Sequence, residues 1–241
     1  MSDELLRKHE NHVTRLTLNR PQKANALSAS LVEALLDAVE YAATDGTRLL
    51  ILDGNGSHFC AGFDFTDVQA SSEGDLALRF IRIETLLQAL FHAPHETLAL
   101  AHGHAFGAGA DIVASCGLRV AAPGTIFRMP GLRFGVVLGT RRLAQRIGSG
   151  KARDILSTSR SFDAEEALAC GFLTGVAAQD TWPKLNAAAQ IAAETLTPSA
   201  AAALHRRTVT DSRAEDMAEL ARSVSPPGLK ERIRRYRESG K

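Results

Sequence analysis

Two glycine-bearing segments of this 241-residue chain have the composition of a site built from backbone groups. The first is GNGSHFCAGFDF, residues 54–65, and the second is HGHAFGAGAD, residues 102–111. Each follows a short apolar run, RLLILD or TLALA, that is typical of a buried strand. Tight glycine turns and helix N-termini leave N–H groups free. Two such groups aimed at one point would form an oxyanion hole, which stabilises charge developing on a carbonyl oxygen.

Asp111 is the last residue of the second segment, so a carboxylate follows directly after its glycine and alanine residues. A carboxylate in that position is a candidate acid or base. Nucleotide binding is a weaker interpretation, because neither segment contains G-x-G-x-x-G or a G-K-[ST] phosphate loop. The segments also fit two tight turns with close helix packing and no chemistry, and the pattern alone leaves that alternative open.

The composition indicates an ordinary globular protein, with 45% hydrophobic residues, 23% charged residues and a formal net charge of +1. Such a balance predicts neither a nucleic-acid nor a membrane partner. The N-terminus is polar, without the apolar core of a signal peptide. Three cysteines, at 60, 116 and 170, lack metal-ligand spacing. We expect free thiols, a reducing cytoplasmic location and no metal site.

Apolar periodicity predicts strands that alternate with helices, and hence helices packed on sheets. Ser28, Ser149 and Asp163 are expected to cap helix N-termini. The expected strands are residues 12–18, 48–53, 97–101, 118–121 and 125–127. The expected helices are residues 28–42, 74–92, 111–116, 181–196, 213–222 and 229–237.

Several motifs in order resemble the crotonase (enoyl-CoA hydratase/isomerase) superfamily: LTLNRPQKANALS, FCAGFDF, AHGHAFGAGADIVASC, FRMPGLRFGV and SFDAEEALACGFLTGV. The resemblance runs from about residue 12 to residue 177. It implies an α/β fold, a spiral of ββα units with two sheets, over residues 1–177. It also implies a C-terminal helical region over residues 178–241 that serves oligomerisation or covers the site.

The resemblance further implies an acyl-coenzyme A substrate, no separate cofactor, and a homotrimer or a hexamer of two trimers. The family stabilises a thioester enolate with two backbone N–H groups. Carried over by position, these belong to Phe63 and Ala108, with Gly62 and Gly107 beside them in the substrate site. Asp111 stands where hydratase-like members carry a catalytic glutamate.

Four further residues are expected near coenzyme A. The resemblance places backbone groups of Ala24 and Ala61 against the adenine and pantetheine portions. Arg20 and Lys23 are candidates for charge-assisted contacts to the phosphates. A solvated surface loop is the alternative for both cations.

The chain departs from the hydratase pattern after Pro130. There Gly131 stands in place of the second catalytic glutamate, so two-acid hydration is not expected to be efficient. Asp111 would then act alone or with His58, His104, Asp64, Asp67 or Glu84. The prediction is an enoyl-CoA hydratase/isomerase-like enzyme of fatty acid metabolism. The alternatives are an acyl-CoA hydrolase, a decarboxylase, a dienoyl-CoA isomerase, or a catalytically weak acyl-CoA-binding protein.

Overall fold

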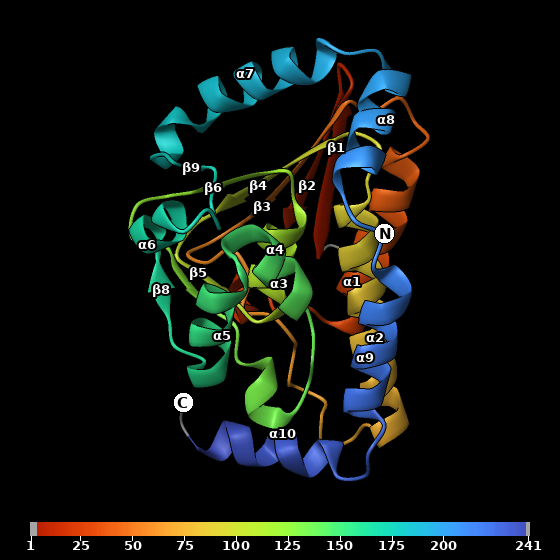
Figure 1. The fold of residues 1–241 in the computed structure, drawn as a ribbon, viewed down its shortest axis with the longest axis vertical. Helices are drawn as coiled ribbons and strands as arrows, with labels where there is room; N and C mark the ends of the chain where they lie inside the picture. The colour runs from red at the N-terminus through yellow and green to blue at the C-terminus, as the bar shows by residue number, and fades with distance from the viewer. Residues whose placement is uncertain (1–3, 240–241) are drawn as a thin grey trace.

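The computed structural model describes residues 4–239, which form two sheets surrounded by helices (Figure 1). The strands are β1 (Leu5–Glu10), β2 (Val13–Leu18), β3 (Leu49–Gly54), β4 (Glu96–Ala101), β5 (His104–Phe106), β6 (Leu118–Ala121), β7 (Ile126–Arg128), β8 (Phe162–Asp163) and β9 (Gly175–Val176). The α-helices are α1 (Ala29–Ala42), α2 (Glu73–Phe91), α3 (Ala108–Ser115), α4 (Thr140–Ile147), α5 (Ser149–Thr158), α6 (Ala164–Ala169), α7 (Trp182–Glu194), α8 (Pro198–Thr208), α9 (Arg213–Val224) and α10 (Leu229–Glu238). Short 3₁₀ helices are η1 (Pro21–Lys23), η2 (Gly131–Phe134) and η3 (Gln179–Thr181).

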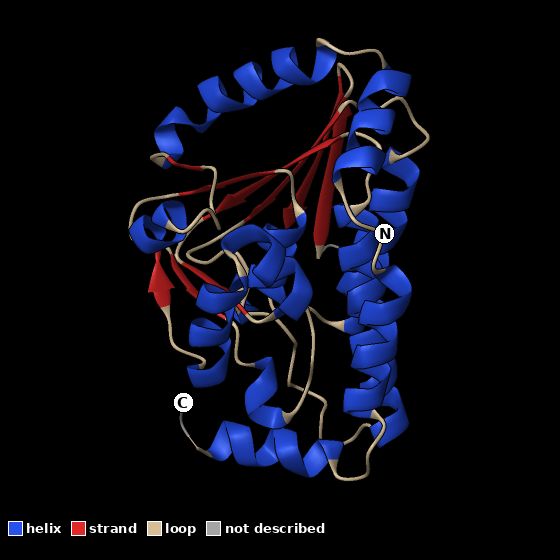
Figure 2. Ribbon diagram, in the orientation of Figure 1, coloured by secondary structure: helices blue, strands red, loops and turns tan. Residues whose placement is uncertain are grey.

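The larger sheet has six strands in the order β1-β2-β3-β4-β6-β9, and only the β1–β2 pair is antiparallel. Its central strands are apolar on both faces because helices or other strands cover both sides. One face packs into the main core with α1, α2 and α3. On the other face, Leu49, Leu98 and Trp182 belong to a second apolar cluster under α7, which lies along the sheet at the top of Figures 1 and 2.

The smaller sheet, β5-β7-β8, contains part of the second glycine segment, because β5 lies within residues 102–111. Strands β5 and β7 are parallel, so Phe106 is paired with Arg128. The N–H of Gly107 continues the pairing by donating to Arg128 O at 2.7 Å. This register places the start of α3 beside the segment that begins at Met129.

Most expected elements are present, with the boundaries shifted by one to three residues. Ser28 Oγ accepts from Leu31 N at 3.1 Å, which confirms this N-cap, and Asp163 caps α6 in the same way. The Ser149 cap is wrong, because Ser149 is the first residue of α5 and Gly148 precedes it. Helix α2 starts earlier than expected, where Ser72 and Asp75 form a capping box. Strands β1, β5, β8 and β9 and helices α4 and α8 were not predicted.

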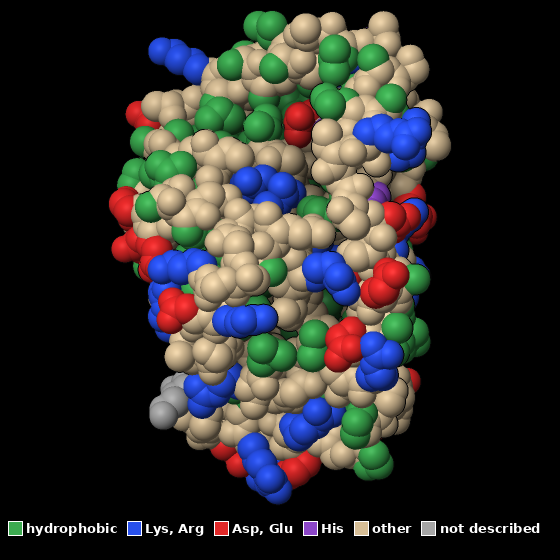
Figure 3. Space-filling model, in the orientation of Figure 1, with side chains coloured by type: hydrophobic (Ala, Val, Ile, Leu, Met, Phe, Trp, Pro, Cys, Tyr) green, Lys and Arg blue, Asp and Glu red, His purple; other side chains and the backbone are tan. Residues whose placement is uncertain are grey.

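After β9 the described elements are all helices. The division into residues 1–177 and 178–241 stays a prediction, and residues 1–3 and 240–241 of these regions lie outside the description. Cys60, Cys116 and Cys170 are free thiols. Over residues 4–239, no helix is long and apolar enough to cross a membrane. On the face drawn in Figure 3, Lys and Arg side chains are interspersed with Asp and Glu.

A buried ion pair joins α2 to α4. The Arg142 guanidinium meets Glu84 at two points, Nη1 with Oε1 at 2.9 Å and Nη2 with Oε2. The two side chains are 3% and 2% exposed. Breaking such a pair from one side leaves an uncompensated charge in the core, whereas replacing both partners with apolar groups is often tolerated.

We therefore expect Glu84→Leu to lower the free energy of unfolding by about 3–5 kcal/mol, and Glu84→Leu/Arg142→Leu to recover much of this loss. Urea unfolding measures both. The matched control is Glu231→Gln, which breaks the exposed pairs with Arg234 and Arg235 and should cost less than about 1 kcal/mol. A double variant as unstable as the single one would contradict the expectation.

Candidate active site

The two glycine segments meet at Gly62. Its φ is +83°, a conformation that side chains rarely adopt. A β-carbon there would lie 2.4 Å from Phe106 O and 3.1 Å from Ala108 N. At a second contact between the two segments, a β-carbon on Gly109 would lie 2.4 Å from Cys60 O. Both glycines are therefore required for the close approach of the two backbones.

The backbone N–H groups of Phe63 and Ala108 are free at this junction. Over residues 4–239, neither donates a backbone or side-chain hydrogen bond. Ala108 is the first residue of α3, where intrahelical partners are missing, and Gly107 before it has φ +52°. The structure thus brings together the two residues expected to supply donors.

Aromatic packing holds Phe63 in place. Its ring stacks on Phe80 with centroids 4.4 Å apart and is tilted against Phe65 at 5.2 Å. The guanidinium carbon of Arg79 lies 4.1 Å from the Phe63 ring centroid on another side. These contacts fix the ring, and with it the backbone that carries the N–H.

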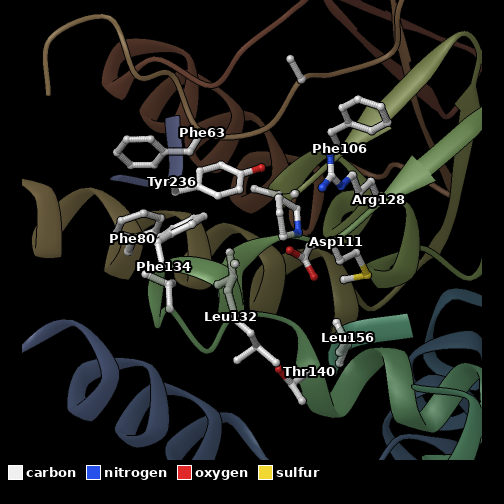
Figure 4. Close-up of a pocket in the computed structure, with 18 of the residues that line it drawn as sticks. Phe63, Phe80, Phe106, Asp111, Arg128, Leu132, Phe134, Thr140, Leu156 and Tyr236 are labelled. Carbon is white, nitrogen blue, oxygen red and sulfur yellow. The ribbon is translucent and has the colours of Figure 1, made fainter. Parts of the chain in front are cut away.

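A cavity of about 110 Å³ opens at the two free N–H groups (Figure 4). This volume has room for several ordered waters or a short acyl group. Figure 4 shows an aromatic side with Phe63, Phe80, Phe134 and Tyr236, and an opposite side with Phe106, Arg128 and Asp111. The lining residues are Ala61, Phe63, Phe65, Phe80, Phe106, Gly107, Ala108, Asp111, Arg128, Met129, Pro130, Gly131, Leu132, Phe134, Val136, Leu138, Thr140, Leu156 and Tyr236.

Asp111 is the acid of this cavity. It is the only Asp or Glu among the described lining residues, and it is 3% exposed. Its Oδ1 is buried without a hydrogen-bond partner among residues 4–239. Gly139, the residue before α4, faces the carboxyl closely, because a β-carbon there would lie 1.6 Å from Oδ1.

Burial raises the pKa of Asp111 to about 8, since the surroundings disfavour the charged form. The Arg142 charge opposes this effect and lowers the pKa, while Glu84 adds to the increase. Because Arg142 is already paired with Glu84, it compensates Asp111 only in part. A carboxyl with this pKa exchanges protons near neutral pH, as a general acid or base requires.

The residues expected at coenzyme A lie around the first glycine segment. Ala61 lines the cavity, and its N–H donates to Ala24 O at 2.9 Å. Lys23 is exposed. Arg20 is bound within the protein, since Nε meets Glu4 at 2.7 Å and Nη1 meets Asp64 at 2.8 Å. The phosphate contacts of Arg20 and Lys23 stay predictions. To bind a phosphate, the Arg20 guanidinium would have to keep or exchange its present bonds to Glu4 and Asp64.

The other possible partners of Asp111 are spread over the molecule. Glu84 is close enough to act on its pKa. Asp64 binds Arg20 and Thr66; although burial opposes ionisation, these hydrogen bonds lower the pKa of Asp64 to about 2. His58 and His104 stack on each other at 4.3 Å, outside the set of lining residues.

Gly131 lines the cavity, so the position without a carboxylate belongs to the site. A β-carbon at Gly131 would lie 2.9 Å from Val136 O, and Gly131 O accepts from Val136 N. Over residues 4–239, no group of three or more His, Cys, Asp or Glu could hold a metal ion.

Sequence reasoning missed Arg128, Gly139, Thr140 and Tyr236. The first lies within the FRMPGLRFGV motif, and Gly139 and Thr140 lie in the segment GVVLGTRRL, residues 135–143, but no local pattern shows what these residues face. Tyr236 comes from α10, 125 positions after Asp111, and has no sequence signal at all.

Comparison with known proteins supports the fold and the family. A family model described as enoyl-CoA hydratase/isomerase matches residues 8–223. A crystal structure from Bordetella parapertussis, described as an enoyl-CoA hydratase/isomerase, is 50% identical with a TM-score of 0.96 and covers 98% of both chains. echA6 of Mycobacterium tuberculosis, described as an enoyl-CoA hydratase, is 35% identical over 163 residues; the match covers 66% of this chain and 65% of echA6. The 2,3-dehydroadipyl-CoA hydratase of Escherichia coli is 31% identical over 182 residues, covering 73% of this chain and 70% of that protein.

The chain therefore has the crotonase fold, as its motifs predicted. It belongs to the enoyl-CoA hydratase/isomerase family, whose members act on acyl-CoA substrates.

The raised pKa of Asp111 makes stability depend on pH. The unfolded carboxyl titrates near 3.9, so between about pH 4 and 8 the native state holds a proton that the unfolded state has lost. Stability from this group falls across that range as pH rises. We expect Asp111→Asn, which cannot ionise, to gain at least about 1.4 kcal/mol relative to wild type between about pH 5 and 9, the equivalent of one pKa unit.

Urea unfolding at both pH values measures this gain. Asp67→Asn, at an exposed position, is the matched control. An equal gain in the two variants, or none in Asp111→Asn, would show that Asp111 is not a buried, proton-holding group.

Proposed function

We propose that this chain binds a short acyl-CoA thioester and moves a proton at its α-carbon. The N–H groups of Phe63 and Ala108 receive the thioester oxygen, and Asp111 exchanges the proton. The observation that carries this proposal is one cavity that contains two free N–H groups and a single buried carboxyl. The family supports acyl-CoA as the substrate class.

In the proposed step, ionised Asp111 takes a proton from the α-carbon. The electron pair of the broken C–H bond moves into the thioester and creates an enolate oxygen. Two N–H donors at that oxygen stabilise the charge without rearrangement. Return of the proton to the α-carbon, or to a conjugated carbon, completes an exchange or a double-bond shift. No cofactor is needed in these steps.

The raised pKa of Asp111 supports this role. A carboxylate with an ordinary pKa is a weak base, whereas one with a pKa of about 8 is far more basic and is still partly ionised near neutral pH. Addition of water to a double bond requires a second acid–base group, because water must be activated while the α-carbon is protonated. At the place of a second acid the chain has Gly131, so hydration is proposed to be slow.

The test is exchange of α-hydrogens of butyryl-CoA for deuterium in D₂O, followed by mass spectrometry. We expect exchange in wild type and a loss of about 10²–10³-fold in Ala108→Pro, which removes one donor. Proline is well tolerated at the first position of a helix, so α3 should persist. Asp111→Asn should also lose the exchange.

Titration calorimetry with acetoacetyl-CoA and circular dichroism accompany this test. A folded Ala108→Pro variant with unchanged exchange would show that Ala108 N–H does not contact the oxygen. Failure of wild type to bind acetoacetyl-CoA at millimolar concentration would overturn the proposed function.

A second variant tests the missing acid. We expect wild type to hydrate crotonyl-CoA slowly and Gly131→Glu to raise the steady-state rate. The increase should be below the roughly 10²–10⁴-fold of a well-placed general acid or base. The reason is steric: the new β-carbon would lie 2.9 Å from Val136 O, so the carbonyl must move. Gly131→Gln, which adds similar bulk without the acid, is the control. Equal rates in the Glu and Gln variants would contradict the role assigned to this position.

A further inference from the structure

Arg128 brings a positive charge, without a protein anion beside it in the described part of the chain, to a cavity that is lined mainly by apolar side chains. Its Nε donates to Ser159 O at 2.9 Å. Within residues 4–239, Nη1 and Nη2 have no hydrogen-bond or ion-pair partner, although Arg128 lines the cavity. Figure 4 shows its guanidinium on the same side as Phe106 and Asp111. The bond to Ser159 fixes the inner edge of the guanidinium and leaves the outer edge for a ligand.

The position of Arg128 ties this charge to the acyl end of the proposed substrate. Phe106 pairs with Arg128 across the small sheet, and Gly107 N donates to Arg128 O. The following residue, Ala108, supplies one of the two free N–H groups. One backbone hydrogen bond therefore joins Arg128 to the residue before Ala108, at the proposed thioester site. Residues 129–132, which follow Arg128 in the chain, also line the cavity.

The chemistry of the group selects its partner. An arginine that presents two free N–H₂ groups matches a carboxylate, which accepts two parallel hydrogen bonds. The two Nη atoms are not among the buried, unpartnered atoms of the described residues, so a ligand can reach them, and an anionic ligand would pair with the charge. Asp111 does not serve as that partner, since the described residues contain no ion pair between the two and Asp111 is held in a site that favours its neutral form.

Building on the proposed function, we infer that the preferred substrate is the thioester of a short dicarboxylic acid, whose free carboxylate pairs with Arg128. The small cavity limits the acyl group to a few carbons. The aromatic side would then cover the hydrocarbon portion, while the carboxylate turns toward the arginine side. This carboxylate stays intact in the reaction and serves only in recognition.

The experiment compares esters of equal carbon number in which a terminal carboxylate replaces a terminal methyl group. Calorimetry on the full chain measures the dissociation constants of succinyl-CoA against butyryl-CoA, and of glutaryl-CoA against pentanoyl-CoA. We expect wild type to prefer the carboxylate ester by about tenfold or more in at least one pair, the size of a charge-assisted hydrogen bond. Arg128→Gln should lose this preference and still bind butyryl-CoA. Arg128→Lys, which keeps the charge, should retain part of it.

Arg133→Gln is the matched control, because Arg133 is exposed on η2 in the same segment and does not line the cavity. It should leave both preferences unchanged. Free CoA and 3′-dephospho-CoA test the phosphates as the alternative anion. If Arg128→Gln weakens free CoA and butyryl-CoA as much as succinyl-CoA, the guanidinium serves the phosphates and the inference is wrong.

Two results separate this inference from the proposed function. Wild type that binds neutral esters without preferring their carboxylate partners overturns the inference alone, and this measurement needs no variant. Wild type that binds no acyl-CoA overturns both.

Discussion

The close contact between two stretches of backbone is the constraint on which the site depends. Gly62 lies against Phe106 O and Ala108 N, and Gly109 lies against Cys60 O, at separations that leave no room for a β-carbon. The surrounding elements maintain this contact. Strands β3 and β4 are adjacent and parallel in the large sheet, so the segments that follow them leave from the same edge. The aromatic cluster around Phe63 then fixes one segment, and the start of α3 fixes the other.

Buried charged groups are the second feature that organises the site, and only two of the three, Glu84 and Arg142, pair with each other. Glu84 and Arg142 satisfy each other in the core, and their pairing joins α2 to α4. Asp111 lies close enough to this pair for both charges to act on its pKa. Burial has the larger effect on that pKa and favours the protonated form. Gly139 contributes by having no side chain, which allows the N-terminal end of α4 to enclose the carboxyl. An ion pair that supports the fold thus also sets the acidity of the proposed catalytic group.

The sequence predicted those parts of the molecule whose signals are local. Short apolar runs located the main strands, and Ser28 and Asp163 marked helix starts, because caps and apolar runs act over a few residues. The glycine segments and Asp111 were found because backbone chemistry needs particular residue types in one stretch. Strand β1 was missed because five of its six residues are exposed and show no apolar alternation. Arg128 and Tyr236 could not be placed, since their roles depend on strand pairing and on helix docking between distant segments.

The use of backbone N–H groups at Phe63 and Ala108 has a consequence for which substitutions the protein tolerates. A backbone donor is supplied by any residue except proline, so the identity of the side chain at these two positions does not determine whether the donor exists. The requirement is transferred to neighbours that are not proposed as donors to the substrate, above all Gly62 and Gly109, which must have no side chain. A random-substitution survey of this protein would therefore find Gly62 and Gly109 among its most sensitive positions, whereas sensitivity at Phe63 would report the packing of its ring and not the donor itself.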